Sequence, residues 1–118
     1  GSREVVNTNS GTKLHSDFVN VRMICTYVGP GTEWVKNEDV VRENLRRSDV
    51  SVEVANRSVL RAPDVVNQCG PGDILFLKGE MFEGNRGTGA VHRSPPVTEQ
   101  GLRRLVLRVE NLRRDRME

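Results

Sequence analysis

Short runs of alternating or β-branched residues recur along the chain and predict strands. The clearest is Val21–Val28, where Val21, Met23, Cys25 and Tyr27 share one face. Residues 73–78 (DILFLK) form a nearly continuous apolar run, which is typical of a strand buried on both faces. The same patterns predict strands over residues 3–7, 13–17, 51–55, 58–61, 90–93 and 103–110.

One helix is predicted over residues 37–47. Asn37 is suited to cap its start, and Val40, Val41 and Leu45 form its apolar stripe. Arg46 and Arg47 suit the negative end of the helix dipole. Turns are expected at the two Gly-Pro-Gly sequences, in the glycine-rich residues 84–89 and at Pro95-Pro96.

Composition supports a mostly β protein, because valine occurs eighteen times and alanine only three. The 118 residues suit one domain. Seven or eight short strands separated by Gly and Pro predict a sandwich or barrel with one short helix, and an eight-stranded jelly roll needs about this much chain. It is expected to span residues 3–110, after a cloning scar at residues 1–2 and before a polar tail at residues 111–118.

The charge balance and the cysteines limit which partners and which cellular compartment are expected. A net charge of +2 offers little field to attract a polyanion, so nucleic acid is an unexpected partner. No apolar run approaches the ~20 residues of a membrane span. Cys25 and Cys69 lie in apolar surroundings, which favours free thiols in a reducing, cytoplasmic compartment; a Cys25–Cys69 disulfide is the alternative.

The two histidines carry the candidate chemistry. His15 and Asp17 are two residues apart, so on a strand both side chains project from one face, with Ser16 pointing away. With the distant His92 they form a set of two imidazoles and one carboxylate, the facial triad that holds non-haem Fe(II) and leaves positions open. A simple surface hydrogen bond between His15 and Asp17 is the alternative.

A candidate anion anchor lies in residues 103–110. Alternation places Arg103 on one face with Leu105, Leu107 and Val109, and Arg104 on the other, polar and solvated face. An arginine on an inward apolar row needs a partner, and its planar fork suits a carboxylate. Either a bound oxoacid or an acidic residue of the protein can supply it.

These residues resemble the H-x-D…H…R signature of Fe(II)/2-oxoglutarate-dependent oxygenases. The resemblance implies a double-stranded β-helix, of the jelly-roll or cupin-like kind. It also implies that His15, Asp17 and His92 hold the iron and that Arg103, eleven residues after His92, binds the distal carboxylate of 2-oxoglutarate. More narrowly, CTYVGPGTEW, GDILFLKGE and GAVHRSPP resemble the bacterial domain-of-unknown-function family 1826, which brings no established reaction with it. That likeness spans residues 3–110, and an N-terminal segment of the full family is expected to be missing.

Four further residues are candidates for contacts with ligands. Tyr27 and Lys78 are candidate cosubstrate contacts, although tyrosine on a strand more often packs its ring and a lysine at a strand end is usually solvated. Trp34, the only tryptophan, and Glu33 are candidate substrate contacts on a predicted loop. Trp34 can equally plug the end of the barrel as core.

Two functions are therefore expected from the sequence. The first is an Fe(II)/2-oxoglutarate-dependent oxygenase of unknown substrate, a small molecule or a peptide. The second is a cupin-like protein that binds Zn(II) or another divalent ion without redox chemistry, since zinc outcompetes Fe(II) at most such sites. A β-sandwich that binds other proteins is a third possibility. A phosphate-binding loop, a structural zinc site and a nucleophile elbow are not indicated, because their motifs are missing from the sequence.

Overall fold

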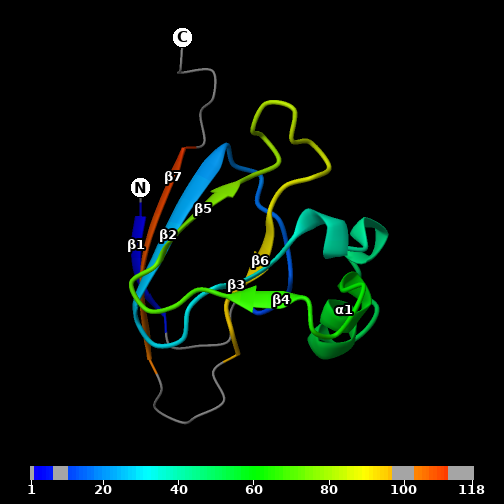
Figure 1. Cartoon of the computed structure of the whole chain (residues 1–118), viewed down its shortest axis with the longest axis horizontal. Helices are drawn as coiled ribbons and strands as arrows, with labels where there is room; N and C mark the ends of the chain where they lie inside the picture. The colour runs from blue at the N-terminus through cyan, green and yellow to red at the C-terminus, as the bar shows by residue number, and fades with distance from the viewer. Residues whose placement is uncertain (1, 7–10, 97–102, 112–118) are drawn as a thin grey trace.

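A computed structural model describes residues 2–6, 11–96 and 103–111 of the chain. Within these residues, seven strands, one α-helix and two short 3-10 helices form a mostly β protein (Figure 1). In chain order they are β1 (Ser2–Val6), β2 (Val21–Val28), β3 (Glu33–Val35), η1 (Asn37–Asp39), η2 (Arg42–Asn44), α1 (Val52–Val59), β4 (Val66–Gln68), β5 (Ile74–Lys78), β6 (Val91–Arg93) and β7 (Arg104–Asn111).

Four strands form the larger sheet, here called sheet A, in the order β1-β7-β2-β5 with every pair antiparallel. Opposite Arg22 stand Leu77 on one neighbouring strand and Glu110 on the other, so these three side chains share a face. This face, here called the inner face, also carries Ile24 and Val106, which pack with Leu77 into a small core.

Three strands form sheet B, in the order β4-β3-β6. A single antiparallel bridge between His15 and His92 adds one more residue pair beyond β6. One face of sheet B packs against α1 and the 3-10 helices through a core of Leu14, Val35, Val40, Val59 and Val91. In Figure 1, sheet A lies on the left, sheet B in the middle and α1 on the right.

The helix prediction was wrong in position. Residues 51–55, predicted as a strand, begin α1, whose buried residues Ala55, Asn56 and Val59 follow helical spacing. The apparent alternation came from Val52 and Val54, which are both exposed. Ser51 accepts a hydrogen bond from the Val54 amide and caps the helix.

Residues 37–47 do not form the single helix that was expected. Two 3-10 turns, η1 and η2, are separated by extended backbone at Val40 and Val41. Val40 pairs with Leu60, and the Val41 amide donates to the Val59 carbonyl. Tertiary pairing of these β-branched residues therefore outweighs local helix formation.

The strands predicted over residues 3–7, 21–28, 73–78, 90–93 and 103–110 hold with small shifts. The strand predicted over residues 58–61 was wrong, because Ser58 and Val59 end α1 and Leu60 forms an isolated bridge with Val40. Two strands were missed. Strands β3 and β4 lie in segments predicted as a loop or left unassigned. Predicted strand 13–17 is reduced to the bridge at His15, and most of the predicted tail lies outside the described residues.

Cys25 and Cys69 are free, as predicted. Within the described ranges, no helix combines the length and apolar character needed to cross a membrane.

Candidate metal centre

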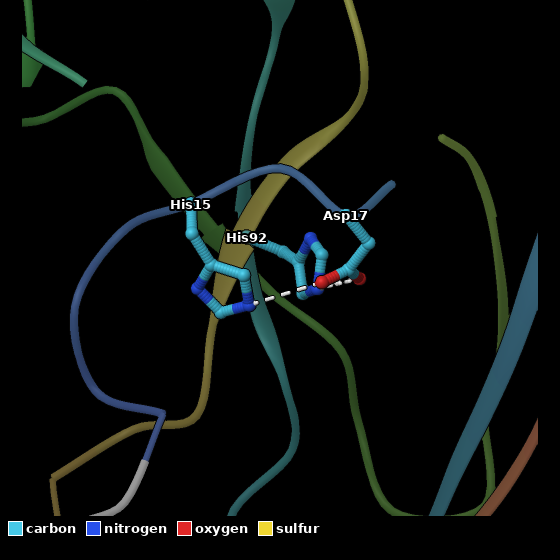
Figure 2. A group of neighbouring side chains, drawn as sticks. All are labelled: His15, Asp17 and His92. Atoms are coloured by element: carbon cyan, nitrogen blue, oxygen red, sulfur yellow. Dashed lines mark ion pairs between the residues drawn. The ribbon is translucent and has the colours of Figure 1, made fainter. Parts of the chain in front are cut away.

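His15, Asp17 and His92 converge between the two sheets, as Figure 2 shows. One ligand atom from each residue lies within 4.8 Å of the others. His15 Nε2 is 3.5 Å from Asp17 Oδ1, and His92 Nε2 is 3.0 Å from Asp17 Oδ2. The convergence predicted from the spacing of these residues is therefore present.

Backbone pairing fixes the two histidines relative to each other. The amide of each donates to the carbonyl of the other, at 3.1 and 3.0 Å. Directly opposed antiparallel residues project their side chains from the same face, here with ring centroids 4.5 Å apart. The separation of the two imidazoles is therefore set by a hydrogen-bonded pair of residues rather than by a loop.

A hydrogen bond to the backbone orients each imidazole. Nδ1 of His15 lies 2.6 Å from the Lys13 carbonyl oxygen, and Nδ1 of His92 lies 3.1 Å from the Ala90 carbonyl oxygen. A carbonyl only accepts, so each Nδ1 carries a proton and each Nε2 faces Asp17. With no second proton on the ring, Nε2 is the atom whose lone pair a metal would take. This is the arrangement by which outer partners orient histidine ligands at metal sites.

Asp17 is also held from sheet A. Arg22 Nη1 lies 2.7 Å from Asp17 Oδ2, and Arg22 Nη2 donates to Glu110 Oε2 at 2.9 Å. Despite these short contacts, Oδ2 receives no well-aligned hydrogen bond within the described part of the chain. The carboxylate thus keeps accepting capacity at the point where both imidazole Nε2 atoms meet it.

The electrostatics favour the ligand forms of two of these side chains. Burial, reinforced by nearby His92, lowers the pKa of His15 below its ordinary value and keeps the ring neutral. Burial alone raises the pKa of Asp17, but close contact with His92 and the positive charge nearby outweigh it, so the net shift is downward. Two imidazoles facing a carboxylate bring three possible metal ligands together, and a divalent cation fits that donor set.

Asn56 positions the segment that carries His15. This buried side chain of α1 accepts from the Leu14 amide at 2.7 Å and donates to the Thr12 carbonyl at 2.9 Å. The Asn56 side chain therefore forms the hydrogen bonds to the backbone of this segment that a neighbouring strand would otherwise form. Nothing in the local sequence identified this residue.

Glu80 holds the next part of the same segment. It is buried, accepts from Ser16 Oγ at 2.7 Å and also accepts from the amides of Gly87 and Gly89. Ser16 thus directs its hydroxyl to Glu80, whereas His15 and Asp17 on either side of it are candidate ligands. A Cβ on Gly89 would lie 2.4 Å from Glu80 Oε2, which explains the glycine there.

Trp34 and Glu33 lie on β3 rather than on a loop, and they face opposite sides of sheet B. Trp34 stands opposite His92 and shares its face, so the indole lies beside the candidate centre. Glu33 points to the other face, where Arg93 Nε donates to it at 2.6 Å. Of these two predicted substrate contacts, only Trp34 is brought to the centre.

The predicted faces of β7 are reversed. Arg103 is exposed, whereas Arg104 is buried, with Nε donating to the Pro30 carbonyl at 2.9 Å. Leu105, Leu107 and Val109 lie on the outer face of sheet A, because the inner face carries the polar groups around Asp17. An inward-facing Arg103 was therefore a wrong expectation.

Tyr27 and Lys78 also lie away from the centre. Lys78 pairs in register with Val21 on the outer face and lies over the Phe82 ring, 4.8 Å from its centroid. Tyr27 is 54% exposed and, with Leu105 and Leu107, lines an outer-face hollow of about 280 Å³. The guanidinium nearest the ligands belongs to Arg22, whose only sequence signal was a charge within an otherwise apolar strand.

Comparison with known proteins identifies a family without a described activity. The family described as "Protein of unknown function (DUF1826)" matches residues 3–110. No curated protein and no solved structure matches the chain.

Proposed function

The chain belongs to this family of proteins of unknown function, and we propose from the geometry of its site that it binds one divalent metal ion through His15, Asp17 and His92. The proposal is supported chiefly by the two Nδ1 hydrogen bonds, which turn both Nε2 lone pairs onto one carboxylate. Three protein ligands leave further coordination positions open, the arrangement used by catalytic rather than structural sites.

A bound Fe(II) or Zn(II) would supply Lewis acidity and, for iron, access to oxygen chemistry. The protein side chains have separate tasks. Lys13 and Ala90 carbonyls fix the tautomers, while Arg22 holds Asp17 from the opposite sheet. Glu110 forms an ion pair with Arg22 and so fixes the guanidinium that contacts the Asp17 carboxylate.

A second candidate is an Fe(II)/2-oxoglutarate-dependent oxygenase, whose ligand type is the one found here. Two antiparallel sheets with the donor set between them support a relation to the double-stranded β-helix. The exposed position of Arg103 weakens its proposed role, whereas Arg22 provides a positive charge at the ligands. An oxoacid would therefore meet Arg22 before Arg103.

Metal titration tests the first proposal. Protein freed of metal is titrated with Co(II) and Zn(II) by calorimetry, and with Fe(II) under anaerobic conditions. We expect one ion per chain, with affinity falling at least ~100-fold in Asp17→Ala and in His92→Ala, beyond the loss usual for an outer partner. The matched control is Glu83→Ala, which removes an exposed carboxylate.

Two outcomes separate the candidates. Unchanged affinity in both ligand variants would refute the metal centre. If metal binds as proposed, the Fe(II) form is supplied with oxygen and 2-oxoglutarate and assayed for succinate. Absence of both 2-oxoglutarate binding and succinate would leave a metal-binding protein without this oxygenase activity.

A further inference from the structure

The outer face of sheet A is apolar and open. Ile74 and Phe76 on β5 are 59% and 67% exposed, and Val109 on β7 is 40% exposed. In register they stand beside Cys25 and Met23 of the central strand β2. The face also includes Val21, Tyr27, Leu105 and Leu107.

This distribution differs from that of an ordinary two-layer protein, because apolar residues lie on both faces of sheet A. The inner face carries charged side chains, among them Arg22, Arg104 and Glu110, while the apolar row of β7 faces outward. The continuous apolar sequence of β5 is typical of a strand covered on both faces, yet only Leu77 among its residues is buried. Sequence and structure together indicate that the outer face is covered in the functional protein.

The size of this face suits a protein interface. Aromatic residues carry about 150–250 Å² each, so Phe76 and Tyr27 alone expose roughly 250 Å². With its aliphatic neighbours the face is on the order of 500 Å², near the upper range for the largest patch on a monomer. A stable complex covers about 800 Å² per partner, so a symmetric contact centred here reaches the required scale once its rim is included.

The chemistry of the face identifies the partner. We propose that the outer face of sheet A binds the same face of a second copy of this chain. On β2, β5 and β7 its residues are uncharged except Lys78 at the end of β5, so two copies can meet over these strands without strong repulsion between like charges. A twofold contact needs only one self-complementary patch, and aligned packing of two sheets buries both faces.

The mass in solution tests this proposal. We expect sedimentation equilibrium at 5–100 μM, roughly the range in which a face of this size associates, to give twice the 13.2 kDa chain mass. Phe76→Asp and Ile74→Asp, made separately at exposed positions, should each weaken the dimer at least tenfold. The matched control is Val54→Asp, at an apolar residue of α1 that is 51% exposed, and it should leave the dimer intact.

Circular dichroism and cooperative urea unfolding show that each variant is folded. A wild-type chain that is monomeric throughout the concentration range would overturn the proposal. A dimer that survives both β5 substitutions, or is lost equally in Val54→Asp, would place the interface elsewhere. None of these outcomes depends on the proposed metal, because the ligands lie on the other side of sheet A.

Discussion

At the scale of single residues, two backbone carbonyls determine which nitrogen each histidine offers. Because burial and His92 lower the pKa of His15, protons compete with a metal only weakly above pH 6.5. We therefore expect Zn(II) affinity to be nearly constant from pH 7 to 8 and to fall only below about pH 6.5, by up to about tenfold per unit of pH as the His15 imidazole takes up its proton. Calorimetry across this range measures the effect, and full affinity near pH 4 would argue against histidine ligands.

Asn56 is the second residue whose removal has a defined consequence. Asn56→Ala leaves the Leu14 amide and the Thr12 carbonyl without their side-chain partner. We expect the free energy of unfolding to fall by about 2–4 kcal/mol, measured by urea denaturation. Arg57→Ala, at the next and exposed position of α1, should change it by under ~0.5 kcal/mol. Equal losses in both variants would contradict the role given to Asn56.

Glu80 predicts a distinct dependence of stability on pH. Burial alone raises its pKa, but hydrogen bonds from Ser16, Gly87 and Gly89 and the charge of Arg42 outweigh this and lower it. Its contribution is therefore complete above about pH 4.5 and is lost as pH falls through the lower pKa of the folded state. Plots of the free energy of unfolding against pH should converge for wild type and Glu80→Gln below the pKa of Glu80 in the folded state. Plots that stay parallel from pH 7 to 3 would exclude this effect.

The three candidate ligands were predictable from residue type and spacing, because an H-x-D pair on extended backbone presents both side chains together. The residues that support them were not. Asn56 acts from a helix 42 residues away from Leu14, and Arg22 reaches Asp17 only through the packing of one sheet on the other. Such contacts depend on tertiary structure, which local patterns do not contain.

At the scale of secondary-structure elements, the errors share a cause. Residues 51–55 alternate like a strand, but a serine cap and the burial of Ala55, Asn56 and Val59 select a helix. In β7, alternation correctly separated the two faces but could not say which one was inward. Periodicity defines faces, and only the neighbouring layer decides their burial.

The helix cap can be tested separately. Ser51→Ala removes the acceptor for the Val54 amide and should cost about 1 kcal/mol of the free energy of unfolding. Ser48→Ala, an exposed serine before the helix, is the control and should be nearly neutral. A cost below 0.3 kcal/mol, well under the usual range of about 0.5–2 kcal/mol, would show that the cap contributes little to stability.

At the scale of the whole molecule, the candidate ligands join the two sheets. His92 belongs to sheet B, while Arg22 of sheet A holds Asp17, so a bound ion should stabilise the packing of the sheets. At a hundred times Kd, Zn(II) should add about 2.7 kcal/mol and raise Tm by roughly 10 °C. Thermal unfolding of wild type and Asp17→Ala with and without Zn(II) measures this, and an equal shift in both would refute it.

The position of Trp34 opposite His92 has an optical consequence. The chain contains a single tryptophan, so its emission reports on one place, a few ångströms from the candidate ligands. An ion with a partly filled d shell, such as Co(II), should quench this fluorescence, whereas closed-shell Zn(II) should leave most of it. The fluorescence of Trp34 should therefore report which of these two ions is bound.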